Sequence, residues 1–184
     1  MRKEYSSKPW IMPQPVLIIG TYDKEGNANA MNAAWGGTYD MDKVFIALSE
    51  HKTTANLKLN KAFTLSFGTR KTVTACDYVG VVSQNKEPNK IKKAGLTPIK
   101  SSKVNAPLFE EFPLTMECEV ESFNKEEGIL IGKVISVSVD ESYIKDGKID
   151  TEKMEFISYD AVNHKYRLVK EEVADAFKVG FTLK

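Results

Sequence analysis

Short strand patterns separated by turn residues dominate this sequence, and they constrain its fold more than any other feature. Apolar and β-branched residues gather in runs bounded by Gly, Pro, Asn and Asp, which is typical of strands. Turn residues at 23–26 and 145–148 predict the tips of two hairpins. The strands expected from these runs are residues 16–22, 28–35, 43–49, 62–68, 114–123, 128–140 and 166–169.

Helical patterns are short and irregularly spaced along the chain. They cover residues 53–60, 72–79, 88–94 and 170–177. Thr53 or Thr54 is expected to cap the first helix, and Gly95 to end the third. Repeated βαβ units would need helices placed regularly between strands, which this sequence lacks. We therefore expect a β-rich α+β fold, an antiparallel barrel of about six or more strands with short helices. A single domain is expected to span residues 1–184.

The pattern of residues 114–123 predicts a strand with one buried face. Met116 and Cys118 alternate with Glu117 and Glu119, so the glutamates are expected to face water. Cys118 and Cys76 lie far apart in the sequence and have apolar neighbours. We interpret both as reduced core residues rather than as a disulfide or a metal site.

Charge and hydropathy exclude some classes of partner. The net charge of +1 gives no reason to expect a nucleic-acid or membrane surface, and no apolar run approaches the ~20 residues needed to span a bilayer. The first ten residues carry positive charge but no apolar segment follows them, so a signal peptide is not expected. The expected location is the cytoplasm.

The familiar catalytic signatures are missing from the sequence. It contains no P-loop, no GxSxG and no GxGxxG pattern. Its two histidines, His51 and His164, have no metal-ligand spacing to another His or to a Cys. Any chemistry must therefore come from a less conventional arrangement.

One segment has the composition of a phosphate site. Residues 49–57 join an apolar strand to the start of a helix, where backbone N–H groups are free to bind an anion. The side chains that could assist are Ser49, His51, Lys52, Thr53 and Thr54. The plainer interpretation is an ordinary strand-to-helix loop with a threonine cap, and the residues alone favour it.

A second unusual segment, residues 26–40, is rich in Gly, Ala and Asn. Small residues let the backbone approach a flat ligand, and Asn side chains offer both donors and acceptors. The alternative is a crowded strand crossing that needs small residues for packing. Several Asn side chains in a half-buried strand are costly without partners, which favours a ligand. Trp35 could stack on a ring or fill the core, and the core is slightly favoured.

Four motifs stand in order along the chain. "PQPVLIIGTYDKEGNANAMNAAW" (residues 13–35) contains a Pro-x-Pro-Val strand followed by N-x-M-x-A-x-W. "LSEHKTTANL" (48–57) joins a strand to the candidate phosphate loop. "CDYVGVVSQNKEPNKIKKAGLT" (76–97) and "YRLVKEEVADAFKVG" (166–180) follow. Together they resemble the landmarks of the flavin reductase-like family, and of the flavoredoxin-like proteins in particular.

The resemblance implies an FMN-binding split β-barrel that forms a homodimer. It implies an oxidoreductase, either an NAD(P)H:flavin reductase or a flavoredoxin-like electron carrier, with NADH or NADPH as electron donor. Its partners would be a small nicotinamide or flavin molecule and, in the carrier case, a redox protein. The positions that it assigns to the isoalloxazine ring are Asn29, Ala30, Met31 and Asn32, with Trp35 nearby. Those that it assigns to the phosphate are Ser49, Thr53 and Thr54, helped by His51 and Lys52, while Ser83 and Lys90 approach the cofactor, Lys90 at the phosphate.

This sequence departs from the family pattern at several points. Asn89 replaces the usual Asp before Lys90, and the segment around Ser83 lacks the common Ser-Gly. The carboxy-terminal motif lacks its late glycines. These departures bear on the role of residues 83–90 and on the carboxy-terminal edge. Because the sequence lacks a dinucleotide-binding fingerprint, a non-catalytic module that holds FMN as a sensor or carrier stays open as an alternative. A β-barrel that binds another small phosphate-bearing ligand is a second alternative.

Overall fold

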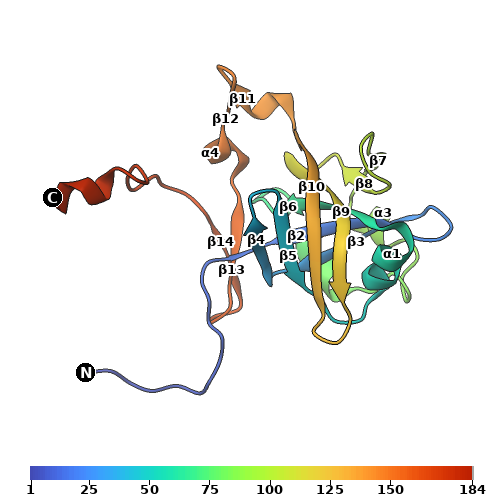
Figure 1. Cartoon of the computed structure of the whole chain (residues 1–184), viewed down its shortest axis with the longest axis horizontal. Helices are drawn as coiled ribbons and strands as arrows, with labels where there is room; N and C mark the ends of the chain where they lie inside the picture. Colours follow the sequence, from blue (N-terminus) through green and yellow to red (C-terminus); the bar gives the residue numbers. More distant parts are fainter. Residues whose placement is uncertain (184) are drawn as a thin grey trace.

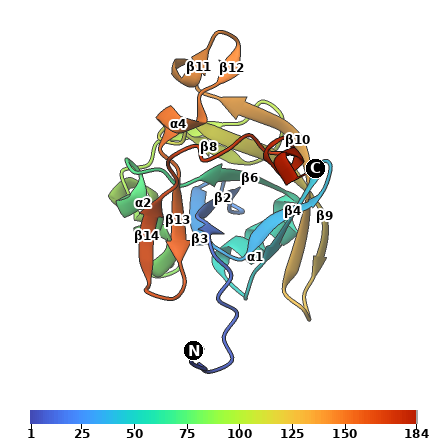
Figure 2. The same cartoon turned by 90° about the vertical axis from the view of Figure 1, so that its left-hand side faces the viewer.

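Seven antiparallel strands form the main sheet of the structure, a computed structural model in which residues 1–183 are described (Figure 1). In sheet order they are β3 (Ala28–Ala33), β2 (Leu17–Tyr22), β6 (Ala62–Phe67), β9 (Leu114–Asn124), β10 (Ile129–Val139), β5 (Lys43–Ala47) and β4 (Gly36–Asp40). Only Ala34 and Trp35 separate β3 from β4 in sequence, yet these strands form opposite edges of the sheet. The sheet therefore curls until its edges approach, which gives a split barrel (Figure 2). The expected fold class is confirmed.

Strand β2 shows why several strand patterns are continuously apolar. Leu17 and Ile19 belong to the core cluster inside the barrel. Val16, just before the strand, and Ile18 belong to a second cluster, packed with residues of helix α2 (Val73–Val81) outside the barrel. Because both faces of the strand are covered, neither needs polar residues.

Three of the four α-helices in residues 1–183 lie close to where the sequence placed them, and the fourth falls at residues 151–154, where no helix was expected. They are α1 (Lys52–Asn60), α2, α3 (Lys90–Lys93) and α4 (Thr151–Met154), together with the 3₁₀ turns η1 (Glu141–Tyr143) and η2 (Val179–Leu183). Gly95 follows α3 with φ +69°, a conformation that favours glycine at a helix end. The N-cap of α1 is His51 rather than a threonine. The prediction of a threonine cap was therefore wrong by two to three positions.

Smaller sheets complete the fold. β1 (Gln14–Pro15), β13 (Ile157–Asp160) and β14 (Lys165–Leu168) form a three-stranded sheet beside the barrel, while β7 (Pro98–Lys100) pairs with β8 (Pro107–Phe109) and β11 (Ile144–Lys145) with β12 (Lys148–Ile149). The β11–β12 pair confirms the predicted hairpin tip. The β13–β14 hairpin is held by Asp160, whose carboxylate accepts hydrogen bonds from the side chains of Asn163 and Arg167. These bonds, that from Asn163 first, hold the pKa of the Asp160 carboxyl well below its usual range.

Two expectations about secondary structure and burial were wrong. Residues 170–178 form no helix, and the chain beyond β14 runs away from the barrel until the short turn η2 (Figure 1). An isolated helical pattern of this length has no surface to pack on here, and short helices are marginal without one. Glu117 was expected to face water but is only 4% exposed. The loop before β8 covers it, and the Ser101 hydroxyl donates a hydrogen bond to its carboxylate.

Candidate functional site

The first turn of α1 is arranged to receive an anion. The helix begins directly after the loop that follows β5, and its first turn contains Lys52 but no acidic residue. Thr54 closes this turn locally, since its hydroxyl accepts from the His51 N–H at 2.9 Å and donates to the His51 carbonyl at 2.8 Å. The hydroxyl of Thr54 thus acts as part of the cap. The backbone N–H groups of the turn and the helix dipole provide the attraction for negative charge.

A buried hydrogen bond connects this turn to β3. The side-chain amide of Asn29 donates to the hydroxyl of Thr53 at 2.9 Å, and both side chains are buried. The carbonyl oxygen of the Asn29 side chain is buried without a hydrogen-bond partner. An unpaired buried acceptor is unfavourable, so this position favours a ligand that donates a hydrogen bond.

Lys90 brings a buried positive charge to the same place. It starts α3, is only 3% exposed, and its ammonium donates to the carbonyl of Ala30 at 2.8 Å. Burial lowers the pKa of Lys90 to about 8. Among residues 1–183 no carboxylate forms an ion pair with this ammonium. A buried cation without a counter-ion favours an anionic ligand.

These groups line one hollow of about 220 Å³, which we name the cationic groove. Its described lining includes Lys52 and Lys90 but no acidic side chain. Gln84 adds a second buried acceptor without a partner, its side-chain carbonyl oxygen, while its amide donates to the Ala28 carbonyl at 3.0 Å. The complete lining is Asn29, Met31, Asn32, His51, Lys52, Thr53, Val79, Gly80, Val81, Val82, Ser83, Gln84 and Lys90.

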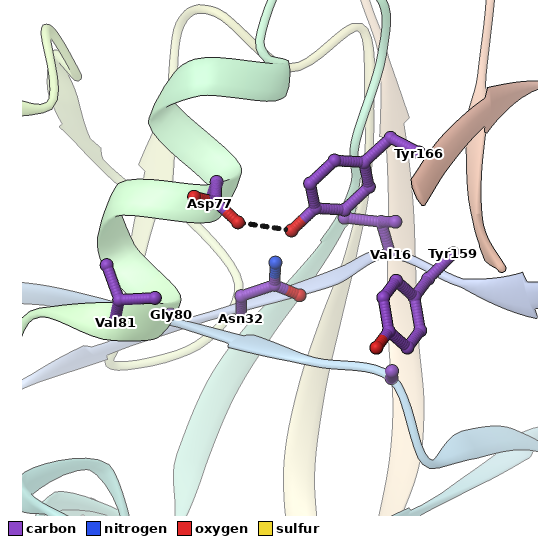
Figure 3. Close-up of a pocket in the computed structure, with 8 residues that line it drawn as sticks. Val16, Asn32, Asp77, Gly80, Val81, Tyr159 and Tyr166 are labelled. Atoms are coloured by element: carbon purple, nitrogen blue, oxygen red, sulfur yellow. Dashed lines mark hydrogen bonds between the residues drawn. The ribbon is translucent and has the colours of Figure 1, made fainter. Parts of the chain in front are cut away.

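A second hollow of about 290 Å³, the tyrosine recess, lies between α2 and the β13–β14 hairpin (Figure 3). Tyr159 and Tyr166 are directly opposite each other in the hairpin, with ring centroids 6.1 Å apart. The hydroxyl of Tyr166 donates to the carboxylate of Asp77 at 2.8 Å. Burial, followed by this contact with Asp77, raises the pKa of Tyr166, so its hydroxyl stays protonated. The recess is lined by Val16, Asn32, Ala34, Asp77, Gly80, Val81, Tyr159 and Tyr166.

The cationic groove and the tyrosine recess are neighbours that share Asn32, Gly80 and Val81. The side-chain amide of Asn32 donates to the carbonyl of Cys76 at 3.0 Å, which fixes it against α2. A Cβ atom at Gly80 would lie 3.1 Å from the Cβ of Asn32, so glycine allows α2 to pack closely on β3 at this point. The two hollows therefore adjoin, one with cationic and the other with aromatic side chains in its lining, and we refer to them together as the elongated site.

The structure brings together most of the residues that the sequence proposed. Eight of them line the cationic groove: Asn29, Met31, Asn32, His51, Lys52, Thr53, Ser83 and Lys90. Ala30 contributes its backbone carbonyl to Lys90. Ser49 and Thr54 do not line the groove. The Ser49 hydroxyl is 3.1 Å from the Nε2 atom of His51, and Thr54 is part of the helix cap.

Trp35 is placed differently from the expectation. Its side chain is 62% exposed and lines neither hollow, so the core interpretation was wrong. The reason is its position in the short link between β3 and β4, where its carbonyl accepts from the Ala47 N–H at 2.7 Å. This bond fixes the link to β5, and the side chain is left exposed.

Sequence reasoning missed Asp77, Tyr159, Tyr166 and Gln84. Asp77 and Tyr166 stood in segments noted for other reasons, and they are 89 residues apart. The signal that could have found the tyrosines is the alternation in residues 156–168, which predicts a hairpin with both rings on one face. In residues 1–183 the structure contains no helix long and apolar enough to cross a membrane.

Comparisons with known proteins identify the family to which this fold belongs. Residues 10–152 match the family model described as flavin reductase like domain. The structure of flavoredoxin from Desulfovibrio vulgaris (Miyazaki F) is similar, with a TM-score of 0.92 and 32% sequence identity over 98% of this chain and 100% of that one. Flavoredoxin from Methanosarcina acetivorans shares the fold, with a TM-score of 0.89 and 23% identity over 100% of both chains.

A curated relative, an uncharacterized protein of Halalkalibacterium halodurans, is 25% identical over 164 residues, which cover 80% of this chain and 78% of the relative. The family match extends over most of the chain and includes the β2–β3 hairpin, the α1 loop and α2. This chain therefore belongs to the flavin reductase-like family.

Proposed function

We propose that this protein binds FMN in the elongated site and acts as a flavin-dependent oxidoreductase. The observation that carries the proposal is that two hollows adjoin. One contains two lysines and a helix N-terminus, and the other contains two tyrosines. FMN has the matching chemistry, since a phosphate stands at one end of the molecule and a planar ring at the other. Membership of the flavin reductase-like family supports the same cofactor.

The residues present fit the phosphate end of FMN. Lys52, Lys90 and the first turn of α1 would hold the phosphate, and His51 adds an N–H donor. The phosphate would supply the counter-ion that Lys90 lacks among the described residues. Ser49 and Thr54 would act indirectly, by fixing His51 and the helix turn.

The residues also fit the remainder of the cofactor. The unpaired side-chain carbonyls of Asn29 and Gln84 are acceptors, and FMN offers hydroxyl and ring N–H donors. Asn32, Gly80 and Val81 would border the ring where the two hollows meet. When bound, the flavin supplies hydride and single-electron transfer, which explains why no catalytic acid or base is needed in the sequence. The chain itself binds the cofactor and orients it.

We further propose NADH or NADPH as electron donor and either free flavin or a redox protein as acceptor. Flavin reductase and flavoredoxin-like electron carrier are the two forms of the function that the family supports. The cytoplasmic location expected from the sequence stays a prediction.

FMN titration of the apoprotein tests the proposal. Saturable quenching of flavin fluorescence is expected, with affinity reduced at least tenfold by Lys52→Ala and unchanged by Lys24→Ala, an exposed lysine at the β2–β3 turn. Absence of quenching by the wild-type protein would refute FMN binding. Anaerobic addition of NADH and NADPH to the loaded protein then separates the functions: bleaching supports an oxidoreductase, whereas a bound flavin that neither nucleotide reduces supports a non-catalytic module or a carrier reduced by another protein.

A further inference from the structure

A group of exposed lysines lies around α2 and α3, outside both the cationic groove and the tyrosine recess. A hollow of about 430 Å³ between the two helices is lined by Lys71, just before α2, and by Lys93, the last residue of α3. Lys92, the neighbour of Lys93, and Lys86, in the loop before α3, are also exposed. We name Lys71, Lys86, Lys92 and Lys93 the lysine face.

The charge of this region differs from that of the chain as a whole. Residues 86–103 contain six lysines and one glutamate, with no arginine or aspartate. The segment therefore carries +5, whereas the whole chain carries +1, so the remaining residues together carry −4. Lys100 and Lys103 extend the positive charge along β7, where they line a further hollow of about 550 Å³. Charge of one sign concentrated on one part of a nearly neutral molecule attracts an oppositely charged partner and orients it.

Most of this positive charge is not neutralised by the chain itself. Among residues 1–183, Lys93 is the one member of the lysine face that forms an ion pair, with Glu87. The carboxylate in the described lining of the hollow belongs to Glu111, and both of its oxygens accept from the N–H of Thr97 at 3.0 Å. The lysine face therefore keeps most of its charge available for a partner.

The composition of the segment favours an acidic protein over a nucleic acid. Residues 86–103 contain no aromatic residue and no arginine. Proteins that bind single-stranded nucleic acids stack the bases on aromatic side chains, and arginine provides bidentate contacts to phosphate. Lysine is a strongly hydrated point charge, and charged contacts of this kind increase the rate of encounter more than the final affinity. Weak electron-transfer complexes, which have small interfaces, need such a surface.

The lysine face borders both parts of the proposed flavin site. Ser83 and Gln84 line the cationic groove, and Lys86 follows them in the same loop. α2 separates the hollow from the tyrosine recess, since Tyr78 lines the hollow and Asp77 the recess. A helix with its side chains is about 10 Å wide, so a protein docked on this face would lie one helix width from the recess. α3 lies on the side of the barrel opposite both termini, and neither terminus covers it (Figure 1).

We propose that the lysine face is the docking surface for an acidic protein that carries a one-electron redox centre. In each encounter the reduced carrier loses one electron to the protein-bound flavin. Two encounters supply both electrons of the reduction, and the protons come from water. This inference rests on the proposed function, and it adds the surface and the charge by which a redox protein would be recognised.

Stopped-flow mixing under anaerobic conditions measures electron transfer to the FMN-loaded protein from an acidic ferredoxin that has been reduced beforehand. The second-order rate constant should fall about tenfold as the salt concentration rises from about 20 to about 300 mM. The double variant Lys71→Glu/Lys92→Glu should lower it about tenfold at low salt. The control Lys145→Glu/Lys148→Glu makes the same change of charge on the β11–β12 hairpin, which projects from the barrel, and should change the rate constant by less than about twofold (Figure 1). Equal rate constants in the two double variants, or a wild-type rate constant independent of salt, would overturn the proposal.

Carbodiimide cross-linking of the apoprotein to the same ferredoxin tests docking without flavin. Mass spectrometry should find the cross-links at the four lysines of the lysine face, with a yield that decreases as salt is added. Such cross-links in a protein that does not bind FMN would refute the proposed function and leave the docking surface in place. Cross-links that are as frequent at Lys145 and Lys148 would contradict docking. Tighter binding of a short single-stranded RNA than of the ferredoxin would identify a nucleic-acid surface and overturn the proposal.

Discussion

The side-chain amide of Asn29 donates a 2.9 Å hydrogen bond to the hydroxyl of Thr53, and this buried contact fixes β3 to the first turn of α1. The two residues come from the two segments that the sequence singled out for separate reasons. Their contact joins β3, which is rich in small residues, and the N-terminus of α1 in a single site. The consequences are testable at both ends of the site.

Replacement of Asn29 should weaken both the fold and the binding of FMN. Asn29→Ala removes the bond to Thr53 and leaves a buried hydroxyl unpaired, at a cost of about 1–2 kcal/mol in the free energy of unfolding. It also removes the buried, unpaired side-chain carbonyl of a residue that lines the groove, so FMN affinity should fall about tenfold, or ~1.4 kcal/mol. Urea unfolding and fluorescence titration measure the two effects. The control is Asn105→Ala, which changes an exposed Asn outside the groove, and equal FMN affinity in both variants would contradict the assigned role.

Lys90 should make FMN binding weaken with rising pH. Its pKa is about 8 because the ammonium is buried, so the free protein loses this positive charge as the pH passes from 7 to 9. The attraction for phosphate falls accordingly, and Lys90→Met should remove this pH dependence while weakening binding at pH 7. Titrations at several pH values provide the measurement. A pH profile shared by wild type and Lys90→Met would show that Lys90 does not face the phosphate.

Lys90 should also make the folded protein more stable as the pH rises, which is opposite to its effect on FMN binding. The pKa of Lys90 in the folded state is lower than the ordinary value of 10.5, so between about pH 8 and 10.5 the unfolded chain binds more protons than the folded one. The contribution of Lys90 to the free energy of unfolding therefore increases as the pH rises through this range. Urea unfolding of wild type and Lys90→Met at pH 7.5 and 9.5 measures it, and the difference between the two proteins should change in favour of the wild type at the higher pH.

Gly80→Ala should lower the affinity for FMN without lowering the stability of the fold. The new Cβ would lie 3.1 Å from the Cβ of Asn32 and would displace the Asn32 side chain where the two hollows adjoin, so FMN affinity should fall about tenfold, or ~1.4 kcal/mol. Alanine favours a helix over glycine by up to about 1 kcal/mol, so the free energy of unfolding should change little or rise. Ala75→Gly, also within α2, serves as the control, with lower stability and unchanged affinity. Loss of stability in Gly80→Ala without loss of affinity would be inconsistent with a ligand at the junction.

Ser101→Ala should destabilise the fold without touching the flavin site. The Ser101 hydroxyl donates to the buried carboxylate of Glu117 and accepts from the N–H groups of Lys103 and Val104, both at 2.9 Å. Its removal leaves a buried carboxylate with one partner fewer, which should cost about 2–3 kcal/mol in the free energy of unfolding. The neighbouring exposed Ser102→Ala provides the matched control. Thermal and urea unfolding distinguish the two, and similar stabilities would mean that Glu117 finds another partner.

Local pattern was sufficient for most of the fold. Continuous apolar runs predicted strands covered on both faces, and β2 has one core cluster on each side. The irregular spacing of short helices correctly argued against repeated βαβ units. The resemblance to the flavin reductase-like family then identified segments that line the cationic groove. Strands, helix spacing and motifs depend on residues that are close in the sequence, so sequence patterns are sufficient to predict them.

The remaining features depend on contacts between distant residues. Lys90 reaches the carbonyl of Ala30 from 60 residues away, and Tyr166 reaches Asp77 only because the β13–β14 hairpin folds against α2. Glu117 is buried by a loop that its own alternation could not reveal.

The sequence by itself therefore determined the strands and the chemical groups available to a flavin. Only the tertiary structure decided which of them meet, because the curl of the sheet, with β3 and β4 at its two edges, brings remote residues together and leaves Trp35 outside. Residues 170–177 also show that a sequence pattern cannot predict tertiary contacts. A helical pattern without a packing surface forms no helix, and what such a segment packs against is a property of the assembled molecule.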